Sequence, residues 1–238
     1  MPSPVHVLLT RPRPQAERFA QTLNLTYRDR IRVVISPILT IRPTNSPVSL
    51  AGVAGVILSS ENAARALAEV ADISGLRAYC VGDRTARIAT ELGMQAISAQ
   101  GTAADLITLV RNTHGMGELL HVHGAHVRGD IAANLNAHGL KTRSQVIYDQ
   151  IETPLDEGAL TLLQGEDPVI CPLFSPRSAL LLGKATEQAR APLALACLSA
   201  AVRAAWAGPE PVAGALAERP DSGALCDILD GLITALST

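Results

Sequence analysis

The 238-residue chain has few aromatic side chains and almost no excess of charge. Aromatic residues make up 3% of it, which leaves few of the stacking platforms that bind single-stranded nucleic acid. The formal net charge is −2, so no general attraction to nucleic acid or to an anionic membrane is expected. Both shortages argue against nucleic-acid binding, and any anionic ligand must be bound by local groups.

Cysteine is scarce, and apolar runs long enough for a membrane span are lacking. The four cysteines include no Cys-x-x-Cys pair, and Cys80, Cys171 and Cys197 lie in apolar, strand-like runs, which is typical of small buried side chains in a reduced, cytoplasmic setting. The most apolar late stretch, residues 191–207, falls short of the ~20 residues that a membrane helix needs. The N-terminus lacks the layout of a secretory signal. We therefore predict neither a targeting nor a transmembrane segment.

Short apolar runs alternate with alanine- and leucine-rich helical patterns along the chain. This alternation predicts an α/β fold in which parallel sheets are covered on both faces. The runs are residues 5–9, 31–35, 56–58, 78–81, 95–97, 119–122, 146–148, 169–174 and 193–198. Helix starts are expected near Pro14, Ser60, Asp83, Thr102, Ser175, Ser199 and Asp221.

The chain contains an internal duplication. Residues 56–67 (VILSSENAARAL) and 169–182 (VICPLFSPRSALLL) each carry an apolar run, a serine and a helical pattern. A second strand-turn-helix follows each copy, at residues 79–92 and 195–206. Two copies imply two similar α/β lobes, in which hydroxyl residues and free N–H groups at helix starts favour anions.

Two extended, proline-bounded segments interrupt the alternation, around residues 36–43 and 146–154. If they pair as a two-stranded connector, the chain ends form one lobe and the middle of the chain forms the other. The expected division is 1–36 with 153–238 for the first domain, 37–43 with 146–152 for the linker, and 44–145 for the second domain. The pattern leaves open two tandem lobes that divide near residues 113–117.

Several motifs in chain order resemble those of bacterial uroporphyrinogen-III synthases. They are LLTRPRPQAERFAQTL, SSENAARAL, VGDRTARIATELG, LLHVHGAHVRGDIAANL with VIYDQ, FSPRSALLL, LSAAVRAAW and RPDSGALCDIL. The resemblance spans nearly the whole chain. It implies two flavodoxin-like, parallel-sheet lobes, the first discontinuous, joined by a two-stranded β-ladder.

The resemblance also implies an activity. The family closes hydroxymethylbilane, a linear tetrapyrrole rich in carboxylates, into uroporphyrinogen III, with inversion of ring D through a spiro intermediate. It works without a metal or an organic cofactor, in the cleft between the lobes. The expectation is thus a cytoplasmic, monomeric lyase of haem biosynthesis that makes transient contact with the preceding pathway enzyme. The alternative is a non-enzymatic, two-lobed binder of an anionic small molecule.

The resemblance assigns roles to three side chains. Tyr148 in VIYDQ assists departure of the substrate hydroxyl group, and otherwise is a half-buried linker aromatic. Thr85 in VGDRTA donates to a substrate carboxylate, or only caps a helix. Arg11 in LLTRP pairs with a substrate carboxylate, or bridges to Glu17 or the backbone at the surface.

Three serines complete the predicted binding site. Ser60 and Ser175 occupy equivalent places in the two copies, where each caps a helix and adjacent backbone amides contact ligand. Ser199 opens a further helix, but Ala200 and Ala201 follow it where relatives show a proline or a threonine pair, which leaves fewer side-chain donors in this turn.

A metal site at His121, His123 and His126 is not expected, because no nearby cysteine or carboxylate completes it. The run GAHVRGD lacks the Gly-Lys-Ser/Thr of a phosphate loop, and the serines lack a nucleophile-elbow frame.

Overall fold

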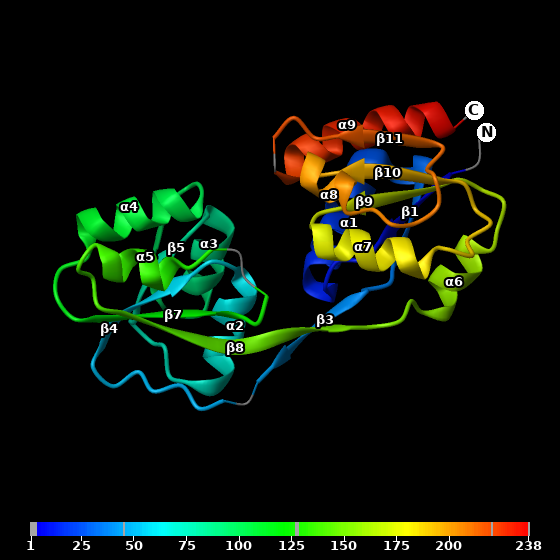
Figure 1. The fold of residues 1–238 in the computed structure, drawn as a ribbon. Helices are drawn as coiled ribbons and strands as arrows, with labels where there is room; N and C mark the ends of the chain where they lie inside the picture. Colours follow the sequence, from blue (N-terminus) through cyan, green and yellow to red (C-terminus); the bar gives the residue numbers. More distant parts are fainter. Residues whose placement is uncertain (1–3, 45, 127–128, 220, 238) are drawn as a thin grey trace. The chain divides into compact units, whose positions relative to one another are not determined.

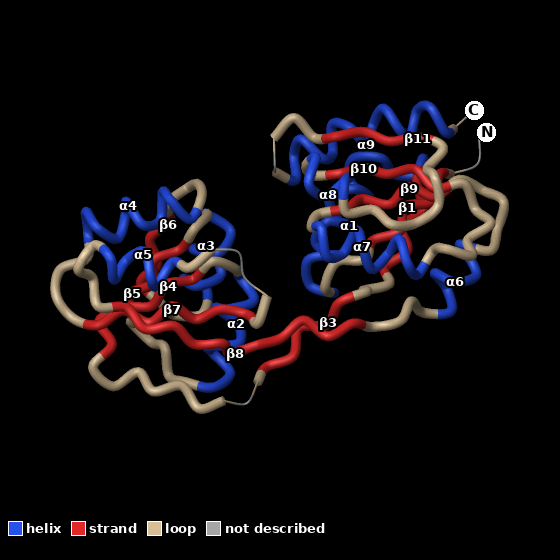
Figure 2. Tube along the Cα trace, in the orientation of Figure 1, coloured by secondary structure: helices blue, strands red, loops and turns tan. Residues whose placement is uncertain are grey.

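The computed structural model describes residues 4–44, 46–126, 129–219 and 221–237. The chain divides into two compact units, the first made of Met1–Thr40 with Glu152–Thr238 and the second of Ile41–Ile151 (Figure 1). The chain passes from one unit to the other within strand β3 (Leu39–Pro43) and again within strand β8 (Thr142–Glu152). Each unit is an α/β layer structure, as Figure 2 shows by the helices that flank the strands.

The first unit contains a five-stranded sheet in which all neighbours are parallel, in the order β11-β10-β9-β1-β2. Its strands are β1 (Val5–Leu9), β2 (Ile31–Ile35), β9 (Val169–Leu173), β10 (Leu193–Cys197) and β11 (Ala213–Leu216). Its helices are α1 (Arg13–Tyr27), the 3-10 turn η1 (Arg28–Arg30), α6 (Glu157–Leu163), α7 (Pro176–Ala185), α8 (Ala200–Ala204) and α9 (Ser222–Leu236).

Helices cover both faces of this first sheet. Side chains of α1 and α9, such as Leu23 and Leu229, form one buried cluster with one face of the strands. Side chains of α6, α7 and α8, such as Leu163, Leu182 and Val202, form a second cluster with the other face. Because both faces are covered, every residue of β9 and β10 is buried, which explains their uninterrupted apolar sequence.

The second unit contains a six-stranded sheet in the order β3-β8-β7-β4-β5-β6. Besides β3 and β8, its strands are β4 (Val53–Leu58), β5 (Arg77–Cys80), β6 (Gln95–Ser98) and β7 (Glu118–Gly124). Its helices are α2 (Glu61–Val70), α3 (Asp83–Glu91), α4 (Ala103–Thr113) and α5 (Ile131–Ala137). Helices α2 and α3 pack on one face of the sheet, and α4 and α5 pack on the other.

Strand β3 lies at the edge of the second sheet, next to β8. The Thr44 N–H donates to the Ile147 carbonyl, and the Thr153 N–H donates to the Ile38 carbonyl. Residue numbers rise on one strand as they fall on the other, so this pair is antiparallel. The predicted linker segments, 37–43 and 146–152, are therefore largely strand, and these strands belong to the six-stranded sheet. A separate linker ladder with those boundaries stays a prediction.

The two sheets have the same spatial arrangement of strands, but the chain enters it at different points. Strands β7 and β8, the last two of the second unit, take the places that β1 and β2, the first two of the first unit, have in the other sheet. Along the chain, the first unit's strands follow 2-1-3-4-5, the flavodoxin-like order. Without β3, the second unit's strands follow 3-2-1-4-5, the other common doubly wound order. The order reverses between β1 and β9 in one sheet and between β4 and β7 in the other, and ligands of such folds bind beyond the strands' carboxyl ends at this switch point. The predicted α/β class, with parallel sheets in two lobes, is confirmed.

Local helix signals are largely confirmed. Ser60, Ser175, Ser199 and Asp221 each accept a hydrogen bond from the backbone three residues later, and Thr102 forms a reciprocal capping box with Asp105. Helix α3 differs from the prediction, because Asp83 is its first helical residue and Gly82 occupies the cap position. No sequence signal predicted β11, a four-residue edge strand that contains Gly214.

Candidate functional site

Tyr148 and Ser60 meet at the switch point of the second unit. Tyr148 lies on β8, Ser60 follows β4, and β7 lies between these two strands in the sheet. The Tyr148 Oη nevertheless lies 3.0 Å from the Ser60 Oγ, so the tyrosine side chain reaches across the end of β7. Tyr148 is 6% exposed, which is more buried than the linker aromatic of the alternative interpretation.

Ser60 links this tyrosine to a helix N-terminus. Its Oγ accepts a hydrogen bond from the Ala63 N–H at 3.2 Å and so caps α2. A serine hydroxyl has one hydrogen to donate, and Ala63 leaves that hydrogen unused. Ser60 is therefore able to donate to Tyr148, which leaves the tyrosine hydroxyl hydrogen for another acceptor.

Burial raises the pKa of Tyr148 above its ordinary value of 10.0, while hydrogen bonds from Ser60 and the Gly124 backbone partly oppose this shift. The phenol is therefore protonated at neutral pH. A protonated, oriented phenol can donate a proton to a leaving group.

Thr85 lies in the first turn of α3, the helix that follows β5. Its side chain is 7% exposed. Gly82 provides no side-chain cap for α3. The first N–H groups of this helix and the Thr85 hydroxyl are thus suited to an anionic group.

An ion pair ties the first turns of α2 and α3 together. The Arg84 Nε lies 3.5 Å from the Glu61 Oε2, and the Glu61 side chain is 10% exposed. Ser60 and Thr85 lie beside this pair, at the starts of the two helices that it links. Residue types alone gave no signal for it, because Glu61 and Arg84 are 23 positions apart (84 − 61) in the sequence.

Arg11 and Ser175 lie at the switch point of the first unit. The Arg11 guanidinium carbon lies 3.8 Å from the centroid of the Phe174 ring, a cation–π contact that directs a cation toward the turn before α7. Phe174 in turn packs edge-on against Phe19, with ring centroids 5.1 Å apart. Glu17, the alternative partner of Arg11, forms an exposed ion pair with Arg13 at 3.7 Å.

The hydroxyl groups of Ser175 and Ser199 act as caps. Ser175 Oγ accepts from the Ser178 N–H at 3.1 Å and lies 2.8 Å from the Ser178 Oγ. Because the Ser178 hydroxyl already donates to the Ser175 carbonyl, Ser175 is the donor in that second bond. Ser199 Oγ accepts from the Val202 N–H at 3.4 Å. The Ser175 hydroxyl hydrogen is thus used within the first turn of α7, whereas that of Ser60 is directed to Tyr148.

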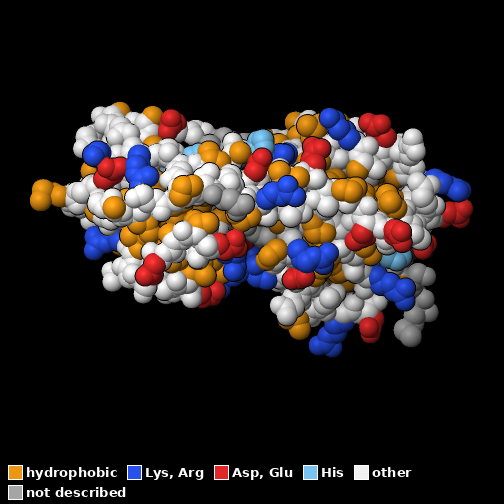
Figure 3. All heavy atoms as spheres, turned by 90° about the horizontal axis from the view of Figure 1, so that it is seen from below, with side chains coloured by type: hydrophobic (Ala, Val, Ile, Leu, Met, Phe, Trp, Pro, Cys, Tyr) orange, Lys and Arg blue, Asp and Glu red, His pale blue; other side chains and the backbone are white. Residues whose placement is uncertain are grey.

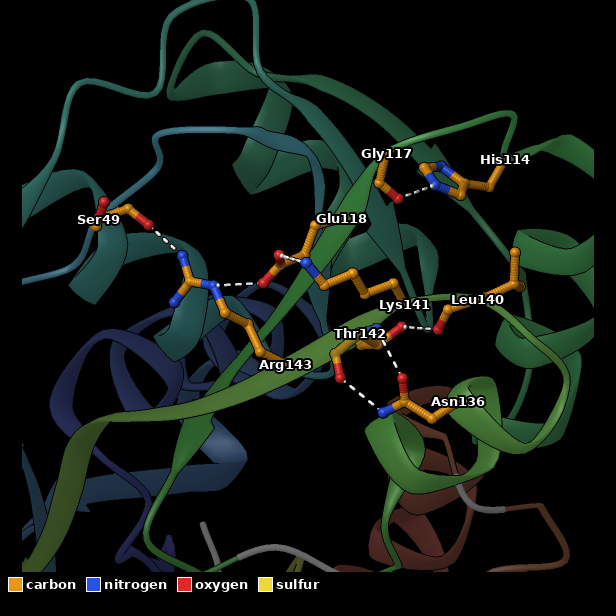
Figure 4. A network of polar contacts seen from close by, with 9 residues as sticks. All are labelled: Ser49, His114, Gly117, Glu118, Asn136, Leu140, Lys141, Thr142 and Arg143. Carbon is orange, nitrogen blue, oxygen red and sulfur yellow. Dashed lines mark hydrogen bonds and ion pairs between the residues drawn. The ribbon is translucent and has the colours of Figure 1, made fainter.

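The opposite, amino-terminal edge of the second sheet carries a cavity of about 550 Å³ and a network of polar contacts (Figure 4). Glu118 at the start of β7 pairs with Lys141 at 2.8 Å and with Arg143 at 3.0 Å. Arg143 also donates to the Ser49 carbonyl, and Asn136 binds the backbone of Thr142 through both its amide atoms. These contacts fix strand ends and loops, and ligands of parallel sheets bind at the other edge.

The histidines of the HVHGAH run make contacts within the second unit. His121 is 3% exposed, packs against His123 and has its pKa lowered to about 4, mainly by burial and then by the charge of His123. His126 pairs with Asp149 at 3.4 Å. Val127 and Arg128 of the GAHVRGD run lie outside the described residues. Among the described residues, no group of three or more His, Cys, Asp or Glu side chains is placed to hold a metal ion.

Basic and acidic side chains are interspersed over the face drawn in Figure 3, in keeping with the net charge of −2. In the described part of the chain, every helix is too short or too polar to cross a membrane.

The known proteins to which the chain is similar are uroporphyrinogen-III synthases. The family model for uroporphyrinogen-III synthase HemD matches residues 22–226. A crystal structure of uroporphyrinogen-III synthetase from Helicobacter pylori 26695 is similar at 12% identity and a TM-score of 0.64, over 96% of this chain and 99% of that one. A mutant uroporphyrinogen III synthase from the extremely thermophilic bacterium Thermus thermophilus shares 18% identity over 98% of each chain, with a TM-score of 0.49. No curated protein matches significantly.

The family model covers most of the chain, and the Helicobacter structure shares its fold. Both agree with the resemblance found in the motifs. The chain belongs to the uroporphyrinogen-III synthase family, the cyclising lyases of haem biosynthesis.

Proposed function

We propose that this chain closes hydroxymethylbilane into uroporphyrinogen III and that Tyr148 is the proton donor for loss of the substrate hydroxyl group. The observation that carries this assignment is the 3.0 Å contact between Tyr148 and Ser60 at the carboxyl edge of the second sheet. It joins a buried, protonated phenol to a capped helix N-terminus at the switch point, where doubly wound folds bind ligands.

The proposed step is a dehydration. The Ala63 N–H donates to Ser60, the Ser60 hydroxyl donates to Tyr148, and the Tyr148 hydroxyl donates to the leaving oxygen. The ring A pyrrole nitrogen supplies the electron pair that breaks the carbon–oxygen bond, and it loses its proton as the azafulvene forms. Carbon of ring D then attacks the exocyclic carbon to give the spiro intermediate, and bond cleavage and reclosure invert the ring. Water is the only product lost.

Substrate carboxylates are bound, in this proposal, by groups at the carboxyl edges of the two sheets. In the second unit these are the Thr85 hydroxyl and the uncapped N–H groups at the start of α3. In the first unit they are the Arg11 guanidinium and backbone amides of the turns that Ser175 and Ser199 cap. Binding fixes the two reacting rings, and this positioning supplies much of the rate because ring closure is intramolecular.

The remaining features of the proposal come from the family resemblance. The chain acts as a cytoplasmic monomer, needs no metal or organic cofactor, and makes transient contact with the enzyme that supplies its unstable substrate. Sedimentation of the purified chain tests whether it is a monomer, and activity after exhaustive chelation tests whether it works without a metal.

Isomer analysis tests the function. Purified protein is given freshly generated hydroxymethylbilane, and the uroporphyrins are separated after oxidation. Because spontaneous closure gives isomer I, we expect an excess of isomer III that grows with protein concentration. Only isomer I, together with saturable binding of the linear tetrapyrrole, would instead support the non-enzymatic binder.

A further inference from the structure

We infer that Gly124 is a positioning residue for Tyr148, and that it acts together with a β-bulge at Ile147. This inference rests on the proposed role of Tyr148. The bulge turns the tyrosine to one face of the sheet, the missing side chain of Gly124 leaves space for the ring, and His123 fixes the Gly124 backbone.

The bulge lies on β8 immediately before the tyrosine. His123 of β7 is in register with Val146, but Gly124 is in register with Tyr148, so Ile147 is an extra residue. Successive side chains of a regular strand point to opposite faces. Ile147 and Tyr148 instead both pack into the core beneath α2 and α3, with exposures of 2% and 6%. A bulge redirects side chains in this way, and here it brings the tyrosine to the face that carries Ser60.

Gly124 occupies the point that the tyrosine ring must cross. A Cβ atom at this position would lie 2.5 Å from Tyr148 Cε2, 2.6 Å from Cζ and 3.0 Å from Oη. Real Cβ atoms essentially never approach another atom that closely, so a larger side chain at this position forces the ring to shift. The backbone of Gly124 does not itself demand glycine, because its φ lies outside the left-handed region. The ring is therefore the reason for glycine at this place.

The backbone of Gly124 is fixed from the opposite face of the sheet. His123 Nδ1 lies 2.8 Å from the Gly124 carbonyl oxygen, and Nε2 lies 2.7 Å from the Ser144 Oγ. A carbonyl only accepts, so Nδ1 carries a proton. The next residue, Ala125, donates its N–H to the Tyr148 carbonyl at 2.9 Å. These bonds hold the end of β7 against β8, so neither strand can shift easily to relieve a clash.

The test is the Gly124→Ala variant, with Gly115→Ala as the matched control. Gly115 lies in the same unit, and a Cβ there meets no atom within 4 Å. We expect Gly124→Ala to lower kcat about 10-fold or more with a smaller change in KM, because it misplaces a proton donor. The control should retain the kcat of the parent protein. A Gly124→Ala enzyme with unchanged kcat would overturn the inference.

A spectroscopic measurement separates positioning from folding. The chain has three tyrosines, so tyrosine labelled with ¹³C at Cζ gives three signals, which Tyr-to-Phe variants assign. We expect Gly124→Ala to move the Tyr148 signal and its titration while those of Tyr27 and Tyr79 stay in place. If the chemical shifts of all three tyrosine signals collapsed together, Gly124→Ala would be unfolded. The measurement would then use His123→Gln in its place, a smaller change that removes a hydrogen bond to the Gly124 carbonyl. An unmoved Tyr148 signal in a folded variant would refute the positioning role.

A double-mutant cycle tests whether Gly124 acts through the hydroxyl group of Tyr148. Phenylalanine at position 148 keeps the ring and the clash but removes the hydroxyl. If Gly124 acts through that hydroxyl, adding Gly124→Ala to Tyr148→Phe leaves kcat unchanged while still reducing stability. A further fall in kcat equal to that of the single variant would contradict the inference. If Tyr148→Phe itself has normal kcat, the proposed catalytic role fails, whereas the NMR result still decides whether Gly124 positions the ring.

Discussion

The carboxyl edges of the two sheets have the same backbone arrangement but carry different side chains. In each, a serine after the strand at the switch point caps a helix: Ser60 after β4 and Ser175 after β9. The Ser60 hydroxyl is bonded to a buried tyrosine, whereas the Ser175 hydroxyl donates to Ser178 in its own helix. Both copies of the duplication thus contain a strand, a capping serine and a helix. The hydroxyl group bonded to the serine differs, and only the second unit has a tyrosine there as a proton donor.

The strand across the switch point accounts for the difference. In the second unit this strand is β7, which ends in Gly124 and leaves space for the Tyr148 ring. In the first unit it is β1, which is followed by buried Thr10 and then by Arg11 stacked on Phe174. We therefore assign proton donation to the second unit and a cationic contact to the first.

Tyr148→Phe should produce the largest loss. Without the phenol hydrogen, general acid assistance disappears, so kcat should fall about 100-fold or more. The midpoint of thermal unfolding should change little by comparison, because the ring remains. Tyr79→Phe is the matched control, since Tyr79 is buried in the same unit and its hydroxyl contacts His114 at 3.3 Å at the other edge. Equal effects of the two variants on kcat would remove the distinction between the edges.

Arg11→Ala should mainly weaken substrate binding. Loss of a charge-assisted contact to a carboxylate should raise KM about 30-fold while kcat changes little. Arg11→Lys should restore only part of the loss, because an ammonium does not reproduce the planar contact with Phe174. Arg13→Ala, which removes an exposed ion pair with Glu17, is the control and should behave as the parent. A dominant loss of kcat in Arg11→Ala would contradict a purely cationic role for the first unit.

Ser60→Ala and Ser175→Ala compare the duplicated serines directly. Both variants lose a helix cap and should be destabilised by a similar amount, about 1 kcal/mol. Only Ser60→Ala also removes the donor to Tyr148, so it alone should lower kcat, by about 10-fold. Ser60→Thr keeps a hydroxyl and should recover most of the rate. Similar kcat values for the two alanine variants would show that Ser60 is no more than a cap.

The smallest expected effect is a pH-dependent change in stability when a carboxylate with a lowered pKa is removed from either unit. Hydrogen bonds from Lys141 and then Arg143 hold the pKa of Glu118 below its ordinary value, and the Ala224 N–H and Arg219 do so for Asp221 in the first unit. A lowered pKa stabilises the fold above the ordinary carboxyl pKa, and the contribution is lost as pH falls through the folded value. Urea midpoints of Glu118→Gln and Asp221→Asn should therefore lie below the parent at pH 7 and converge with it in acid. A constant gap at all pH values would contradict this account.

Local features of the molecule could be predicted from the sequence, and non-local ones could not. Strand runs, the serine caps and the capping box at Thr102 depend on neighbours a few residues away, and the family motifs identified the fold and the activity. The bond between Ser60 and Tyr148 joins residues 88 positions apart and depends on strand order. The bulge at Ile147 and the space at Gly124 depend on register between two strands, which apolar patterning does not specify. The ring that supports Arg11, Phe174, was likewise visible only as part of an apolar run.

The most direct test of this account is the isomer ratio formed by Tyr148→Phe beside the parent protein, both given the same limiting amount of fresh hydroxymethylbilane. The account predicts mainly uroporphyrin III from the parent and a rise of isomer I with the variant, because spontaneous closure then outruns the slowed enzyme. Isomer III formed by the variant at the parent's rate would contradict the assignment of the proton donor to the second unit.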